Sequence, residues 1–223
     1  MKRVEASFLV RRWLSSRSGG VFWILLLSLL VAGCSPGTEG SSVQSSCGFV
    51  QNVYGERISW KGQLPIRLLV DPSVPVAYRT AVQAATQTWN RNAKKEIFRL
   101  EFSSGPLPLV RGDGLSVLSF LSDWEAGRAS EQGRTTISWV GDRIKDADVR
   151  VNARDFTFYS GPLASDRRDA VNLEALILHE LGHVLGLKHS DSMTSVMAVY
   201  LPAQTDRVEL TASELESLGC EYL

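Results

Sequence analysis

The chain has 223 residues, and its 24 Lys plus Arg are matched by 24 Asp plus Glu, so the formal net charge at pH 7 is zero. Hydrophobic residues make up 44% of the sequence and charged residues 22%, a composition that suits one folded domain. The even charge, and short basic runs that have no aromatic residues interleaved with them, argue against a nucleic-acid-binding protein.

The first 31 residues combine a basic segment with an apolar one. Residues 1–20 carry five basic side chains against one acid, and residues 21–31 form an apolar run that is short for a membrane span. This pattern predicts a secretory signal, with an uncleaved signal anchor or a buried apolar helix as the alternatives. Arg11 and Arg12 faintly resemble a twin-arginine signal, which leaves the export route open.

The apolar run ends at Val31-Ala32-Gly33-Cys34, which resembles the lipobox of bacterial lipoproteins. The resemblance implies that residues 1–33 are a signal peptide and that Cys34 becomes the lipidated N-terminus. Two or three acyl chains anchor a protein stably, whereas one chain binds a membrane only marginally. Ser35, rather than Asp, follows the cysteine, which in Gram-negative lipoproteins implies the outer membrane. We therefore expect a membrane-anchored protein outside the cytoplasm.

Behind the cysteine, residues 35–46 are small and polar, which is typical of a flexible linker. We predict that residues 34–55 are the lipidated cysteine and a tether, and that residues 56–223 form the folded domain. Apolar or alternating patterns predict strands at 64–70, 97–102, 115–121, 135–140 and 147–152. Helical periodicity predicts helices over 76–92, about 169–187, and from Thr211, where Glu214 completes a capping box. This order indicates an α+β domain.

Residues 179–189 read His-Glu-x-x-His-x-x-Gly-x-x-His. On a helix, His179 and His183 lie one turn apart on the same face, a spacing that lets two neutral imidazoles reach one Zn²⁺. Gly186 has no Cβ, so it can adopt a left-handed conformation that ends the helix and returns His189 to the metal. Three protein ligands leave the fourth position to water, which is the arrangement of a catalytic zinc.

Glu180 follows the first ligand and is expected to face the cleft beside that water. A carboxylate there can accept the proton of the water as it attacks a carbonyl, and then deliver it to the leaving amine. The chain has only three histidines, and all of them lie in the motif. Ordinary helix histidines would not be grouped in this way, so the motif predicts hydrolysis without a protein nucleophile.

The extended motif resembles that of the metzincin zinc peptidases, and Ser190 after the third histidine is similar to the matrixin branch. Matrixins carry a methionine on a tight turn beneath the zinc, and Met197 stands at the matching interval. Met193 would leave too short a loop. The resemblance extends over residues 56–223, and it implies a twisted mixed sheet of about five strands with three main helices.

The same resemblance implies that residues 135–140 form the edge strand on which an extended peptide substrate pairs. It also implies that residues 198–202 form a wall of the substrate pocket. Val199 stands where matrixins usually have a proline, and Pro202 comes later, which leaves the form of that wall open.

Metals beyond the catalytic zinc have little basis in the sequence. The second, structural zinc of many matrixins needs further histidines, and the chain has none. Calcium could be held by surface acids, although such acids are usually only solvated; the candidates are Asp113, Asp123, Asp142 and Asp148.

Cys47 and Cys220 lie near the two ends of the mature chain. In an oxidising compartment this even pair suggests a disulfide. Alternatively, Cys47 could be a thiolate that blocks the zinc, as in the latency segments of some related enzymes. No recognisable pro-segment surrounds it.

These features favour a monomeric zinc endopeptidase that acts on proteins or peptides outside the cytoplasm. The alternative is a catalytically silent zinc-bearing lipoprotein that binds peptides or serves as a scaffold. Glu180 favours the enzyme, because an inactive relative would commonly have lost it. An exopeptidase or a self-processing enzyme would share the chemistry and differ in the shape of the cleft.

Overall fold

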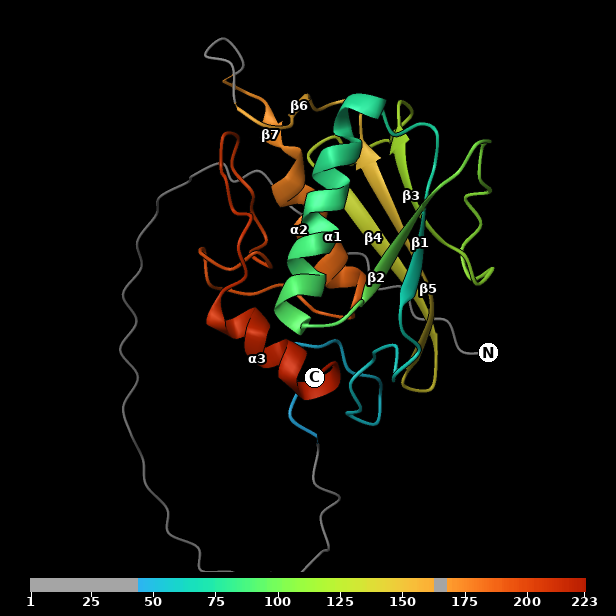
Figure 1. Cartoon of the computed structure of the whole chain (residues 1–223), viewed down its shortest axis with the longest axis vertical. Coiled ribbons are helices and arrows are strands. Elements are labelled where there is room, and N and C mark those ends of the chain that lie inside the picture. The colour runs from blue at the N-terminus through green and yellow to red at the C-terminus, as the bar shows by residue number, and fades with distance from the viewer. Residues whose placement is uncertain (1–43, 163–167) are drawn as a thin grey trace, which may run out of the picture.

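The computed structural model describes residues 44–162 and 168–223. The predicted signal segment and Cys34 lie outside these residues. The main sheet has the order β2-β1-β3-β5-β4 (Figure 1). Its strands are β1 Ile66–Val70, β2 Phe98–Phe102, β3 Ser116–Leu121, β4 Gly133–Val140 and β5 Arg143–Asn152. All neighbours are parallel except β4, which runs antiparallel to β5 at one edge.

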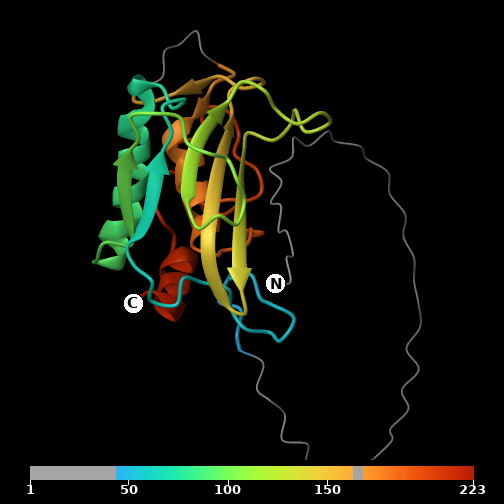
Figure 2. The ribbon, with the colours of Figure 1, turned by 90° about the vertical axis from the view of Figure 1, so that its right-hand side faces the viewer.

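Two helices cover one face of this sheet, and a third lies at one end of the domain (Figures 1 and 2). They are α1 Arg79–Ala93, preceded by the 3-10 turn η1 Val76–Tyr78, then α2 Leu173–Val184 and α3 Ala212–Glu221. Trp89 of α1 is fully buried, and its indole N–H donates to the carbonyl of Leu178 in α2 at 3.1 Å. This contact ties α1 to α2 on the same face of the sheet.

The five-stranded mixed sheet with three α-helices confirms the predicted α+β class. Within the described residues, none of the helices has both the length and the apolar character needed to cross a membrane. Strand β5 begins four residues before the predicted start, because Ile144 is buried between the exposed Arg143 and Lys145, so the alternation continues.

The start of α2 differs from the prediction of about residue 169. Val171 and Asn172 form the short strand β7, which pairs in parallel with β6, Phe158–Tyr159. The Asn172 side chain then caps α2 by accepting from the N–H of Ala175 at 3.2 Å. A two-residue strand has no periodicity of its own, which is why the sequence pattern continued the helix through it.

Part of the predicted tether is folded into the domain. Phe49 is buried at 1% exposure and packs against Tyr222, with ring centroids 5.9 Å apart. A disulfide links Cys47 to Cys220 in α3. The segment Cys47–Val50, here called the N-terminal strap, is therefore held against the C-terminal end of the chain.

Candidate metal centre

Helix α2 carries the first two predicted ligands on a buried face. His179 and His183 are 4% and 1% exposed. The helix ends at Val184, and Gly186 follows with φ of +100°, a conformation that favours glycine. A Cβ on Gly186 would also lie 2.2 Å from the carbonyl oxygen of Ile58. The chain can therefore reverse here and bring His189 back toward the helix only because this residue is glycine.

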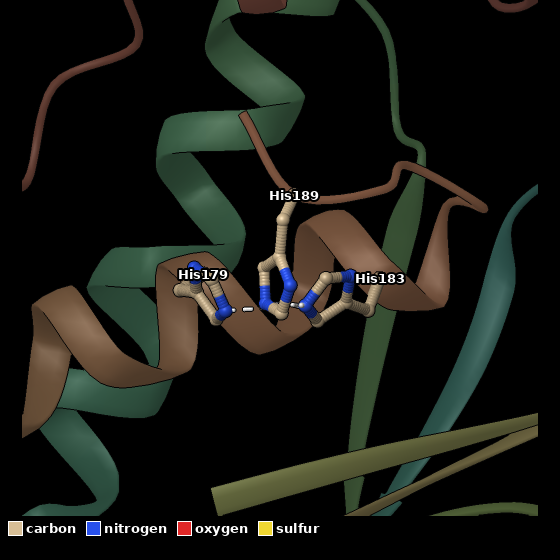
Figure 3. A group of neighbouring side chains, drawn as sticks. All are labelled: His179, His183 and His189. Atoms are coloured by element: carbon tan, nitrogen blue, oxygen red, sulfur yellow. Dashed lines mark hydrogen bonds between the residues drawn. The ribbon is translucent and has the colours of Figure 1, made fainter. Parts of the chain in front are cut away.

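The three imidazole rings converge on one point (Figure 3). The Nε2 atom of His183 lies 3.1 Å from Nε2 of His179 and 3.2 Å from Nε2 of His189. The Nδ1 atom of His179 lies 2.7 Å from the carbonyl oxygen of Val196, and Nδ1 of His183 lies 2.8 Å from that of Leu187.

These carbonyl contacts fix the tautomers of the two helix histidines. Only an N–H can donate to a carbonyl oxygen, so in neutral His179 and His183 the proton is on Nδ1 and the lone pair is on Nε2. Two lone pairs that face each other at 3.1 Å repel unless a cation lies between them. The donor set therefore fits a Zn²⁺ ion bound by three neutral imidazoles.

Burial keeps the ligands in the neutral form that binds metal. Loss of hydration lowers the pKa of His179 to about 3 and that of His189 to about 4. Burial, with the neighbouring histidines, also lowers the pKa of His183 well below its ordinary value. All three rings are therefore uncharged at neutral pH, so metal binding need not displace a proton from them.

In the described ranges, His179, His183 and His189 form the only group of three or more histidine, cysteine or acidic side chains whose ligand atoms lie within 4.8 Å of one another. The four acids suggested for calcium form no such group in the described structure.

Glu180 lies between α2 and the edge strand β4 and is 1% exposed. Its Oε2 accepts from the Thr135 hydroxyl at 2.6 Å, and its Oε1 faces Gly133, where a Cβ would come within 2.7 Å. Burial raises the pKa of Glu180 to about 7, opposed by the Thr135 hydrogen bond. A carboxyl with this pKa can both gain and lose a proton near neutral pH.

Met197 lies directly beneath the histidine pair and is 3% exposed. A Cβ on Gly182 would lie 2.2 Å from its Sδ atom, so the thioether occupies the space that Gly182 leaves open. The preceding residue, Val196, provides the carbonyl that holds His179. Met193, by contrast, is 61% exposed.

The sequence profile of the matrixin family matches residues 76–222, a range that includes α1, the whole sheet except β1, and every residue of this centre. The chain belongs to the matrixin family. Individual matrixin-type relatives match shorter stretches. Metalloendoproteinase 1-MMP of Arabidopsis thaliana is 31% identical over 104 residues, which cover 47% of this chain and 25% of the relative.

Two further relatives match still shorter stretches of the chain. Metalloendoproteinase 1 of Glycine max is 30% identical over 78 residues, or 34% of this chain and 26% of the relative. Metalloendoproteinase 2-MMP of Arabidopsis thaliana is 41% identical over 54 residues, or 24% of this chain and 14% of the relative. The matched part of the chain thus spans about a quarter or less of each of these relatives.

The elements predicted to bind substrate are strand β4, which packs against α2, and residues 198–202. Strand β4 contains Thr135–Val140 at the open edge of the sheet. Leu201, in the predicted pocket wall, accepts from the Gln132 side chain at 3.0 Å, which ties the wall to the start of β4. Tyr200 of the wall lines a cavity of about 700 Å³ together with Gln132 and Phe156.

Three residues of the matrixin site were not predicted from the sequence. Gly133 and Thr135 contact the Glu180 carboxylate from a strand about 45 residues earlier in the chain, so no local spacing indicates them. Gly182 lies inside the motif, and its lack of a side chain between two ligands was the one available signal. Cys47 and Cys220 lie away from the histidines and are bonded to each other, which removes Cys47 as a free thiolate for the metal.

Proposed function

We propose that this matrixin domain is a zinc-dependent endopeptidase in which Glu180 is the general base. The observation that carries the proposal is the convergence of three neutral imidazole nitrogens beside a buried carboxyl. Zinc, when bound, would lower the pKa of a water molecule and polarise the substrate carbonyl. The names of the relatives, all metalloendoproteinases, support the same activity.

Residues of the chain itself would bind the substrate, transfer the proton and hold the ligand rings. An extended peptide pairs with the free edge of β4, which places its scissile bond beside α2. Glu180 accepts the proton of the attacking water and donates it to the leaving amine, because its pKa of about 7 lies close to the working pH. The Nδ1 contacts to Val196 and Leu187 keep two ligand rings in place during the cycle.

We also propose that the enzyme works outside the cytoplasm, anchored through a lipidated Cys34 behind a signal peptide of residues 1–33. The proposal rests on the basic and apolar segments and on the lipobox-like Val31-Ala32-Gly33-Cys34. The Cys47–Cys220 disulfide supports an oxidising compartment, since such bonds are rare in the cytosol. The substrates would then be envelope or extracellular proteins.

The test uses the detergent-solubilised full chain and a mixture of unfolded proteins as substrate. We expect cleavage that a zinc chelator abolishes and added zinc restores, and a loss of about 100-fold or more in Glu180→Ala. Cleavage unchanged by chelation or by Glu180→Ala would overturn the mechanism. Stoichiometric zinc without cleavage of any substrate would favour the silent peptide-binding lipoprotein instead.

A further inference from the structure

The inner face of β4 is built around the Glu180 side chain. Residues 133 and 135 lie two apart on the strand, so their side-chain positions point to the same face. Thr135 is fully buried, and its hydroxyl lies 2.6 Å from Glu180 Oε2 and 3.2 Å from the backbone carbonyl oxygen of Glu180. One hydroxyl therefore contacts both the carboxyl and the backbone of the same residue.

A threonine hydroxyl has one hydrogen to donate and two lone pairs to accept with. When Glu180 is ionised, the hydrogen goes to Oε2, the nearer acceptor and the charged one. The Glu180 carbonyl oxygen, at 3.2 Å, is the more distant second acceptor for the same hydroxyl. Thr135 is therefore held by the backbone of Glu180 while it donates to the carboxylate of the same residue.

Gly133 limits the carboxyl on its other side. A Cβ at this position would lie 2.7 Å from Oε1, which is closer than real Cβ atoms come, and 3.3 Å from the carboxyl carbon, a tight contact. The Arg150 carbonyl oxygen lies 3.4 Å from the same Cβ position, so it is the carboxyl that an added methyl would displace. In the observed position, Oε2 meets the hydroxyl and Oε1 fits over the glycine.

We propose that Thr135 is a positioning residue for the general base and that Gly133 provides the space this position requires. The inference rests on the proposed peptidase function. A buried carboxyl without a hydrogen bond is costly and is free to choose another rotamer. Misplacing a catalytic group by about 1 Å costs about 100-fold in rate, so a loss of this contact is expected to lower kcat rather than raise KM.

The chain offers a matched control away from the site. Thr86 of α1 is also buried, at 4% exposure, and its hydroxyl donates to the Gln83 carbonyl at 2.8 Å. Thr135→Val and Thr86→Val make the same chemical change, and only the first removes a partner of Glu180. Thr135→Ser keeps the hydroxyl, and Gly133→Ala adds the Cβ that the space excludes.

The experiment measures kcat and KM on a peptide substrate with the zinc content of each full-length variant. We expect kcat to fall about 10- to 100-fold in Thr135→Val and Gly133→Ala, with KM and zinc content within about twofold of the unmodified protein. Thr135→Ser should recover most of kcat, and Thr86→Val should stay within about twofold. A normal kcat in Thr135→Val, or a Thr135→Ser as slow as the valine variant, would overturn the proposal.

A second measurement separates this inference from the peptidase function itself. Urea unfolding of Thr135→Val, Glu180→Ala and the double variant forms a cycle that needs no substrate. If Thr135 holds the Glu180 side chain, the double variant loses less stability than the sum of the single changes. Additive losses of stability would show that the two side chains do not interact, even if the enzyme is active. Non-additive losses in a protein that cleaves no substrate would support the contact and contradict the proposed peptidase function.

Discussion

At the residue scale, the packing beneath the two helix ligands depends on the absence of a Cβ atom at Gly182. Gly182 lies in α2 between His179 and His183, and a Cβ there would meet Met197 Sδ at 2.2 Å and its Cε at 3.0 Å. The backbone on either side carries the ligands, so any shift that relieves this clash moves them. The glycine and the methionine therefore act as one packing unit beneath the metal.

We expect Gly182→Ala to destabilise the domain by about 1–3 kcal/mol, as overpacking of a buried site does, and to release zinc more readily to a competing chelator. The matched control is Gly219→Ala in α3, where an added Cβ meets nothing within 4 Å. Thermal unfolding and chelator competition measure the two effects. A Gly182→Ala protein as stable and as zinc-retentive as the control would contradict this account.

A second residue-scale prediction concerns pH and a site remote from the histidines. Asp148 in β5 is 5% exposed, and its Oδ1 accepts from the N–H of Val117 at 3.2 Å. Burial raises its pKa to about 7, with repulsion from Asp146 and Asp113 adding to the rise and Arg150 opposing it. The folded state thus holds a proton that the unfolded state releases near pH 4, so this residue makes stability fall as pH rises from about 4 to 7.

Asp148→Asn should remove this fall in stability with pH, because an amide does not titrate in this range. Its side-chain oxygen can still accept from the N–H of Val117. The stability of the variant relative to the unmodified protein is expected to increase between pH 5 and pH 8 by about 2 kcal/mol. Urea unfolding of both proteins at the two pH values measures the difference, and contributions from the metal ligands cancel in the comparison. A relative stability that stays constant or decreases over this range would show that Asp148 is ionised throughout.

At the element scale, the N-terminal strap supports the turn that carries the third ligand. The N–H of Val50 donates to the Gly186 carbonyl at 2.8 Å, and the N–H of Lys188 donates to the Gly48 carbonyl at 2.8 Å. The Cys47–Cys220 disulfide fastens this strap to α3. These two hydrogen bonds hold the turn from Gly186 to His189 against the strap, which lies outside both α2 and the histidine motif.

Removing the disulfide with Cys47→Ser and Cys220→Ser is expected to cost about 2–4 kcal/mol of stability, because the cross-link restricts the unfolded chain. Zinc affinity should fall as well, since the strap then holds the ligand turn less firmly. Urea unfolding and chelator competition test both effects, and the unmodified protein in reductant serves as the comparison. If reduction leaves stability and zinc binding unchanged, the strap does not depend on its cross-link.

Features that depend on residues close together in the sequence could be predicted from it, whereas contacts between distant segments could not. The ligand pair and Glu180 share one helix, whose geometry sets their spacing, so eleven consecutive residues predicted the metal centre. The capping box was equally local, and the N–H of Thr211 donates to the Glu214 carboxylate at 2.8 Å. The Thr135 contact arises only when β4 packs on α2, and the folded strap only when Phe49 meets Tyr222, which no periodicity within either segment indicates.

At the scale of the whole molecule, the predicted anchor lies outside the described residues, and the chain enters the domain close to α3. Arg57, Ser59 and Lys61 near this entry all contact Glu221, the last residue of α3. The described chain thus begins and ends at the same side of the domain (Figure 1). A lipid on Cys34 would hold this side nearest the bilayer.

We expect Cys34→Ser, expressed in a Gram-negative host, to lose incorporation of labelled fatty acid and to move from the membrane fraction to the soluble fraction. Its peptidase activity after purification should match that of the unmodified protein, because Cys34 precedes the domain. Fractionation with fatty-acid labelling is the measurement, and Cys47→Ser is the control for loss of a cysteine. Labelled fatty acid retained in Cys34→Ser would place the modification elsewhere.

The disulfide between Cys47 and Cys220 also determines what a cut in the domain would do. Any single peptide bond broken between these residues, by another protease or by a second copy of this one, leaves two fragments that are still covalently joined. Both fragments would remain on the same anchor, and a nicked molecule would run as one band on a gel until a reductant is added. A single cut between Cys47 and Cys220 would therefore be visible on a reducing gel and hidden on a non-reducing one.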